Sequence, residues 1–310
     1  MNIILGSGVI GLMAKHMLGD NWTVIPFNRS RFYSFTPALC DDYIIRNEEL
    51  DTNIADIIGY KPNLIAHQKA WSINGELTKK PDKTLAEAWI YKAIGPNIPE
   101  QYKLYYDQMM TFKYDLKITH LYDRLLSTYI KDLKAESTKG NVEEIHDHYI
   151  IRNGKRTDFD KCISTIPLNK TLDLIGYKHT LKSLNMHVTY LTSNTIDLEG
   201  ADDALVVDKL LSFYKVSKIC NNEYILYWHE DVENIGPYLM NIIPNFDLLS
   251  GTTVPDAIIL GTPQGLDILE KYGIFSVGCY AEWDWCMDVG SCILKLLRYC
   301  NNIKRMTIIE

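Results

Sequence analysis

The chain has 310 residues, of which 46% are hydrophobic, enough for one large α/β domain with an insertion or for two domains with a sizeable core. Its formal net charge of −7 disfavours broad electrostatic capture of duplex nucleic acid, although a local basic groove is compatible with this charge. The sequence has no run of about 18 apolar residues, so we expect no transmembrane helix and no membrane partner.

The N-terminal residues carry no basic segment, and the 7 cysteines are scattered without a C-x-x-C pair. These features predict that the protein has no signal peptide, keeps its thiols reduced and is cytoplasmic. No cysteine spacing has the short paired ligands of a zinc motif, so we predict no metal site.

The most informative motif lies at residues 3–11, which read Ile-Ile-Leu-Gly-Ser-Gly-Val-Ile-Gly. In a G-x-G-x-x-G motif after a strand, the first glycine permits a tight turn and the second lets a pyrophosphate approach the backbone. The third lets the following helix pack closely on the sheet. A predicted helix over 12–18 would direct its N–H groups and dipole at the phosphates, and a second strand over 22–27 completes the βαβ setting. The motif predicts a dinucleotide site formed by Gly6, Ser7, Gly8, Val9, Ile10 and Gly11.

The residues after the second strand leave the dinucleotide undecided. An acidic residue that holds the adenosine ribose is expected there, but the chain has Asn28 and Arg29. The Asn28 amide can hydrogen-bond a ribose hydroxyl without a charge, whereas Arg29 favours a phosphorylated ribose. FAD, NAD and NADP therefore all remain open from these residues.

The next segments differ in character. Residues 29–50 are typical of an extended loop, and residues 51–115 of an inserted, mainly helical segment with a helix over 84–93. Apolar residues every four positions predict an amphipathic helix over 118–133.

A series of short strands follows, with Asn153-Gly154 as a two-residue hairpin turn and a buried strand within 160–167. The strands before that buried one are predicted over 135–137, 142–146, 148–152 and 156–159. Alternating residues over 186–230 predict an antiparallel sheet distinct from the parallel one. The chain ends with an apolar strand over 274–278 and a helix over 287–299.

Three separate pieces resemble the flavoproteins of the amine-oxidase and UDP-galactopyranose-mutase superfamily. They are the G-x-G-x-x-G motif, the strand end Ser164-Thr165-Ile166-Pro167, and Gly278-Cys-Tyr-Ala-Glu-Trp-Asp before the final helix. The resemblance implies an α/β fold with a glutathione-reductase-type FAD-binding Rossmann domain, a β-meander and a second, α+β substrate domain with an antiparallel sheet. The FAD domain would comprise residues 1–50, 115–175 and 260–310, and the substrate domain 51–114 and 176–259. Compact proteins that the chain resembles occur in phage genomes, some beside genes for modified DNA bases.

The resemblance also implies FAD contacts at the end of the chain. In the family a last strand delivers a glycine, here Gly278, which is followed by an arginine that this chain replaces with Cys279. The closing helix then directs its N-terminus at the flavin pyrimidine carbonyl, and the matching backbone here is Met287, Asp288 and Val289.

Four other residues are candidates for chemistry. Trp283 and Trp285 would line the flavin or pack in an ordinary core. His229 would act as a base above the flavin or lie at a strand end on the surface. Lys215 would anchor a substrate anion or be a solvated strand lysine.

The leading functional hypothesis is an FAD-dependent oxidoreductase that oxidises a C–N bond of an amine or amino-acid-like group. The alternatives are a UDP-galactopyranose-mutase-like isomerase, an oxidase of a modified nucleobase in phage DNA, and a flavin-binding protein without catalysis. The expected partner is a small-molecule or nucleobase-linked amine, and the sequence does not predict the oligomeric state. No arginine lies between Arg156 and Arg298, which disfavours a diphosphate substrate and ranks the mutase second.

Overall fold

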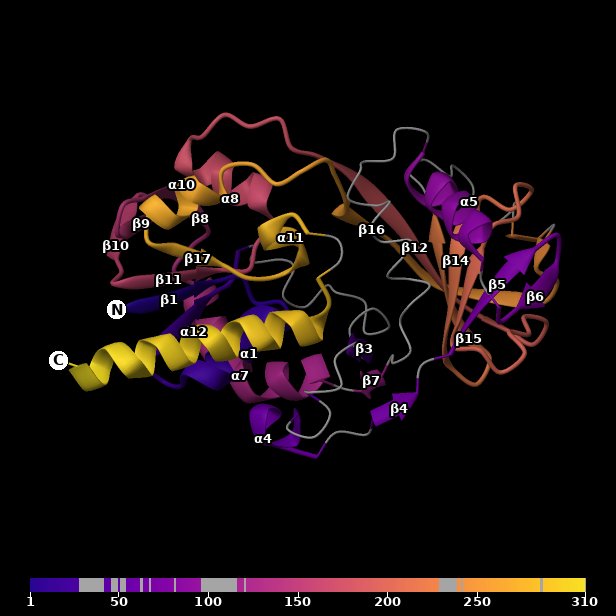
Figure 1. The fold of residues 1–310 in the computed structure, drawn as a ribbon, viewed down its shortest axis with the longest axis horizontal. Coiled ribbons are helices and arrows are strands. Elements are labelled where there is room, and N and C mark those ends of the chain that lie inside the picture. The colour runs from indigo at the N-terminus through magenta and orange to yellow at the C-terminus, as the bar shows by residue number, and fades with distance from the viewer. Residues whose placement is uncertain are drawn as a thin grey trace. The chain divides into compact units, whose positions relative to one another are not determined.

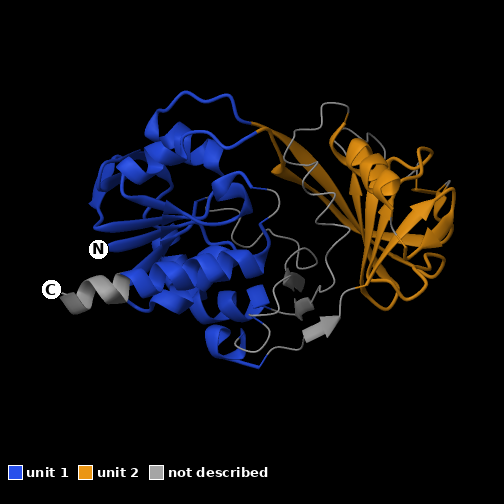
Figure 2. Cartoon of the chain, in the orientation of Figure 1, with its two compact units in different colours: residues 1–65, 114–181, 262–310 blue, residues 66–113, 182–261 orange. Residues whose placement is uncertain are grey.

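The chain divides into two compact units, each built from separate segments (Figure 2). Unit 1 comprises Met1–Ile65, Tyr114–Leu181 and Thr262–Glu310, and unit 2 comprises Ala66–Lys113 and Lys182–Gly261. The computed structural model describes residues 1–27, 42–45, 50, 54–61, 64–66, 68–80, 82–95, 116–119, 121–228, 239–240, 242–284 and 287–309.

A four-stranded parallel sheet lies at the centre of unit 1, in the order β17-β11-β1-β2. Its strands are β1 (Asn2–Leu5), β2 (Trp22–Ile25), β11 (Lys161–Ser164) and β17 (Ile274–Ser276). Strands from the two ends of the chain thus flank β11 in one sheet. Because all four strands run parallel, their carboxyl ends meet at one edge of the sheet.

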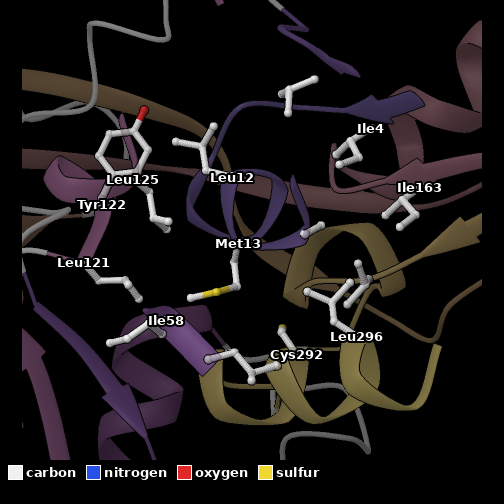
Figure 3. Close-up of a cluster of buried hydrophobic side chains, with 14 of the residues drawn as sticks. Ile4, Leu12, Met13, Ile58, Leu121, Tyr122, Leu125, Ile163, Cys292 and Leu296 are labelled. Carbon is white, nitrogen blue, oxygen red and sulfur yellow. The ribbon is translucent and has the colours of Figure 1, made fainter. Parts of the chain in front are cut away.

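Three helices cover one face of this sheet: α1 (Val9–Leu18), α7 (Leu121–Ser137) and α12 (Val289–Ile309) (Figure 1). Their apolar stripes meet in the core that Figure 3 shows, where Met13 of α1 lies among side chains of α7 and α12. The short helix α4 (Ile54–Ile58) adds Ile58 to this core. Burial of these side chains is the main stabilising contribution to unit 1.

An antiparallel meander of β8 (Val142–His146), β9 (Tyr149–Arg152) and β10 (Lys155–Asp158) precedes β11. Asn153 and Gly154 join β9 to β10 with φ of 47° and 68°, which confirms the predicted hairpin turn. Unit 1 also contains α8 (Leu168–Ile175), α10 (Leu266–Lys271) and the single turn α11 (Cys279–Glu282).

The predicted strand over 135–137 is wrong, because these residues form the last turn of α7. The buried guanidinium of Arg152 on β9 donates to the Glu136 carboxylate at 2.8 Å and to its main-chain oxygen at 2.6 Å. This tertiary contact holds the final turn in helical form. The helix also begins later than predicted, because Leu116–Thr119 is a strand, β7, of a small sheet in the order β3-β7-β4. Its partners are β3 (Asp42–Ile45) and β4 (Leu64–Ala66).

Unit 2 is built on a seven-stranded sheet in the order β16-β12-β15-β14-β13-β5-β6, in which only the β13–β5 pair is parallel. The strands are β5 (Lys69–Ile73), β6 (Glu76–Thr78), β12 (Lys182–Ser193), β13 (Asp203–Val206), β14 (Phe213–Cys220), β15 (Glu223–Trp228) and β16 (Phe246–Leu260). Helix α5 (Lys83–Ile94) packs on the sheet, where the Trp89 indole N–H donates to the Tyr214 carbonyl at 2.6 Å. The predicted antiparallel sheet is confirmed.

The prediction of a mainly helical segment over 51–115 is wrong in part, since residues 69–78 form the hairpin β5–β6 at one edge of this sheet. The predicted helix over 84–93 is confirmed by α5. The long strand β16 at the opposite edge was not predicted. Its many exposed residues give no clear apolar alternation.

Candidate functional site

Three loops lie together at the carboxyl edge of the parallel sheet in unit 1. Main-chain hydrogen bonds continue past the strand ends: the Thr165 N–H donates to the Leu5 carbonyl at 2.9 Å, and the Val277 N–H donates to the Ser164 carbonyl at 3.0 Å. The first bond holds the start of the glycine loop after β1 beside the turn that follows β11, and the second holds the end of β11 beside the turn that follows β17. This edge is where ligands bind in open α/β sheets.

The glycines of the first loop serve two different purposes. A Cβ atom on Gly11 would lie 2.0 Å from the Gly6 carbonyl oxygen, and Gly6 itself has φ of 104°. Both positions therefore need glycine for the turn and for close packing. Gly8 has φ of −69° and ψ of 177°, which any residue adopts, and a Cβ there would meet nothing within 4 Å. The space beside Gly8 is therefore open to a ligand.

Helix α1 begins directly after Gly8 without a side-chain cap and without an acidic residue in its first turn. The first N–H groups of a helix lack intrahelical partners, and the helix dipole favours an anion there. The backbone of Val9, Ile10 and Gly11 thus forms an anion-binding end beside the open space at Gly8. A pyrophosphate fits this arrangement of backbone N–H groups.

The second element of the site is the turn after β17. Gly278 has φ of 126°, and the nearest atom to an added Cβ would be the Ala281 Cβ at 3.8 Å. Its N–H donates to the Glu282 carboxylate at 3.2 Å, and Glu282 is paired with Lys295 of α12. Burial is the largest influence on Glu282 and raises the pKa of its carboxyl, against the opposing effect of Lys295.

The N-terminus of α12 is partly satisfied by its own chain. The Asp288 carboxylate accepts the Ser291 N–H at 2.7 Å and so acts as the helix cap, while the Asp288 carbonyl accepts the Cys292 N–H at 3.1 Å. The Met287 N–H is also engaged, because it donates to the Asp284 carbonyl at 3.2 Å. The protein itself therefore occupies part of the donor set that the sequence assigned to a flavin oxygen. Met287 and Val289 flank this cap and are half-buried.

Cys279 lies at the start of α11, at the position where the flavoproteins that the sequence resembles have arginine. Its backbone N–H donates to the sulfur of Cys292, a buried residue of α12, so this position is tied to the core of unit 1. A cation nonetheless lies near this turn, because Lys295 is paired with Glu282, whose carboxylate accepts the Gly278 N–H.

Among the predicted aromatic residues, Trp283 is fully buried and has φ of 58°. A bulky residue in the left-handed region is uncommon, so its surroundings fix the backbone at this point. Full burial agrees with the packing interpretation of this side chain. Trp285, His229, Asn28 and Arg29 lie outside the described residues.

Lys215 on β14 belongs to unit 2 and is neither a solvated lysine nor an unpaired one. Its ammonium lies 2.9 Å from the Asp203 carboxylate, and the two side chains are 24% and 6% exposed. The Ser217 hydroxyl donates to the same carboxylate at 2.5 Å, and the ammonium lies 5.0 Å from the centre of the Tyr227 ring. Because Asp203 neutralises the positive charge of Lys215, this lysine does not offer the unpaired cation that would anchor an anionic substrate.

Replacing Lys215 with methionine is expected to destabilise the protein by about 3 kcal/mol, because the buried Asp203 carboxylate loses its cation. The double variant with Asp203→Asn should regain most of this loss, since the amide needs no cation and still accepts from Ser217. Urea unfolding of the wild type, both single variants and the double variant measures the coupling. Lys215→Met with unchanged stability would contradict a structural role for the pair.

Within the described part of the chain, no group of three or more His, Cys, Asp or Glu side chains is arranged to hold a metal ion. None of the described helices combines the length and apolar composition needed to cross a membrane.

No protein-family model matches the chain, and a search of curated proteins finds no match. Solved structures do share its fold. Reduced UDP-galactopyranose mutase matches with a TM-score of 0.64 at 13% identity, over 98% of this chain and 95% of that one. An oxidoreductase from Methanosarcina mazei matches with a TM-score of 0.61 at 12% identity, over 97% and 99%. L-proline dehydrogenase from P. horikoshii matches with a TM-score of 0.50 at 11% identity, over 94% and 90%. The chain therefore has the mixed α/β fold of these enzymes.

Proposed function

We propose that the chain is an FAD-dependent oxidoreductase. The observation that carries this proposal is the open space beside Gly8, in front of the uncapped N-terminus of α1 and at the carboxyl edge of the parallel sheet. A pyrophosphate needs such a space and such donors. The shared fold with an oxidoreductase and a dehydrogenase supports the redox assignment.

Unit 1 would be the FAD domain, of the glutathione-reductase type, with the meander β8–β10 as its characteristic insertion. Unit 2 would supply the substrate domain through its large sheet. The residues that would hold the cofactor are the backbone groups of the glycine loop at the pyrophosphate and the first turn of α12 at the flavin. When bound, FAD accepts the hydride that the substrate loses.

Within this class, we propose oxidation of a C–N bond in an amine or amino-acid-like substrate. A diphosphate substrate needs cations, and the chain has no arginine between Arg156 and Arg298. Lys215, the lysine that the sequence suggested as an anion anchor, is already paired with Asp203. Both observations favour a substrate without a strongly charged diphosphate.

A mutase-like isomerase is the second candidate. It is favoured by the fold match with reduced UDP-galactopyranose mutase and by the Met287-Asp288-Val289 sequence where α12 begins, which resembles the signature of the mutases at this position. An isomerase of this kind needs a reduced flavin but performs no net oxidation, and this property separates it from an oxidase.

The cofactor is tested first. The purified protein should show the two flavin absorbance bands, directly or after incubation with FAD, and heating should release FAD because no covalent link is expected. NADPH, tested by the same titration, is the control ligand. Binding of NADPH without FAD would overturn the cofactor assignment.

The reaction is tested on the FAD-loaded protein. An amine panel that includes aminated nucleobases should yield hydrogen peroxide under air, together with bleaching of the flavin bands when oxygen is excluded. Conversion of a UDP-sugar only after reduction with dithionite, without peroxide, would contradict amine oxidation and support the isomerase. FAD binding with no turnover in either assay would contradict both and leave a non-catalytic flavoprotein.

A further inference from the structure

The glycine loop is held in place by a residue from a different strand end. Thr165, directly after β11, makes two hydrogen bonds to one acceptor, because its N–H and its hydroxyl both donate to the Leu5 carbonyl at 2.9 Å. Leu5 is the last residue of β1 and precedes Gly6. Thr165 therefore fixes the point where the strand gives way to the loop.

The Thr165 hydroxyl oxygen also lies in the space that side chains would fill if Gly6 and Gly11 were larger residues. It would lie 2.5 Å from a Cβ atom on Gly6 and 3.0 Å from one on Gly11. An oxygen is smaller than a methyl group, so the hydroxyl fits against both glycines where a methyl group in its place would press on the loop. The oxygen thus serves as a donor to Leu5 and as a spacer between the two glycines.

We propose that Thr165 is a positioning residue of the phosphate-binding loop, which it aligns through Leu5, Gly6 and Gly11 for a dinucleotide pyrophosphate. This inference rests on the proposed function, since it concerns the same cofactor site. A loop already fixed in its bound geometry loses less conformational entropy when the ligand binds. The hydroxyl therefore acts on cofactor affinity, although it need not touch the cofactor.

An effect of the Thr165 hydroxyl on cofactor affinity can be distinguished from an effect on the stability of the fold. The Leu5 carbonyl keeps the bond from the Thr165 N–H when the hydroxyl is removed, so no buried acceptor is left unpaired. Loss of the hydroxyl should therefore change the unfolding temperature by only about 2–4 °C, the effect of one hydrogen bond in a unit of this size. The effect on cofactor binding should be larger than this change in stability implies.

The test compares three variants of the full chain, Thr165→Val, Thr165→Ala and Thr165→Ser. FAD is titrated into each cofactor-free protein by fluorescence quenching, and the unfolding temperature of the same samples is measured without FAD. We expect the valine variant to bind FAD about tenfold more weakly, the alanine variant somewhat less affected, and the serine variant within about threefold of the wild type. Rescue by serine assigns the effect to the hydroxyl.

Equal FAD affinity for the serine, alanine and wild-type proteins would overturn the inference. It would also be overturned if the alanine variant lost affinity only together with a large fall in its unfolding temperature. If the valine variant does not fold, the comparison of alanine with serine decides. A wild-type protein that takes up no FAD would instead overturn the proposed function, so the two failures are distinguishable.

Discussion

Replacing Gly8 with valine is expected to abolish measurable FAD binding while the protein remains folded. The backbone at Gly8 has an extended conformation that valine adopts without strain, and an added Cβ meets no protein atom within 4 Å. The valine side chain would instead fill the space in front of α1 that we assign to the pyrophosphate. We expect at least a hundredfold weaker binding, equivalent to about 2.7 kcal/mol.

Fluorescence titration with FAD measures this effect, and far-ultraviolet circular dichroism with thermal unfolding verifies the fold. Gly8→Ala is the graded control, because one methyl group intrudes less than three carbon atoms and should weaken binding less. If Gly8→Val bound FAD as tightly as the wild type, the residues over 3–11 would not form a pyrophosphate cradle.

Replacing Gly11 with alanine is expected to have the opposite profile, with a loss of stability rather than a selective loss of binding. The added Cβ would lie 2.0 Å from the Gly6 carbonyl oxygen, a backbone atom that moves only if the loop moves. Alanine is normally favoured over glycine within a helix by about 1 kcal/mol, but this clash should outweigh that gain and leave a net loss of about 3 kcal/mol.

Such a loss would lower the unfolding temperature of unit 1 by roughly 6–12 °C. Thermal unfolding followed by circular dichroism measures it, with Gly8→Ala as the matched control for a methyl group added to the same loop. A Gly11→Ala protein more stable than the wild type would show that α1 is packed less closely on the loop than the structure indicates.

Local backbone chemistry is what the sequence predicted best. The dinucleotide loop and the Asn153-Gly154 hairpin both depend on residues that tolerate a positive φ, and such preferences act within a few residues. The same signal was present at Asn74-Gly75, whose φ values are 51° and 83° and which joins β5 to β6. This Asn-Gly pair predicts a hairpin turn within residues 51–115, the segment that we expected to be mainly helical.

Side-chain pairing, in contrast, was decided by tertiary structure. Asp203 lies on β13 and Lys215 on β14, and only the antiparallel register that pairs Leu205 with Lys215 brings their charges together. The Lys215 ammonium, which the sequence left open as a solvated group, is thus half-buried and neutralised by Asp203. Likewise, Glu136 lies in the last turn of α7 and not in the predicted strand, because it accepts hydrogen bonds from Arg152, sixteen residues further along the chain.

The sequence by itself determined the glycine loop, the parallel strand before it and the helix that follows, because steric freedom at glycine is a property of single residues. The resemblance implied that Thr165 and Gly278 belong to the same domain as this loop, but only the tertiary structure decided that all three lie at one edge of the sheet, with Thr165 bonded to Leu5. Those residues are brought together by hydrogen bonds between β1, β11 and β17, strands separated by more than a hundred residues, and no local preference encodes such a pairing.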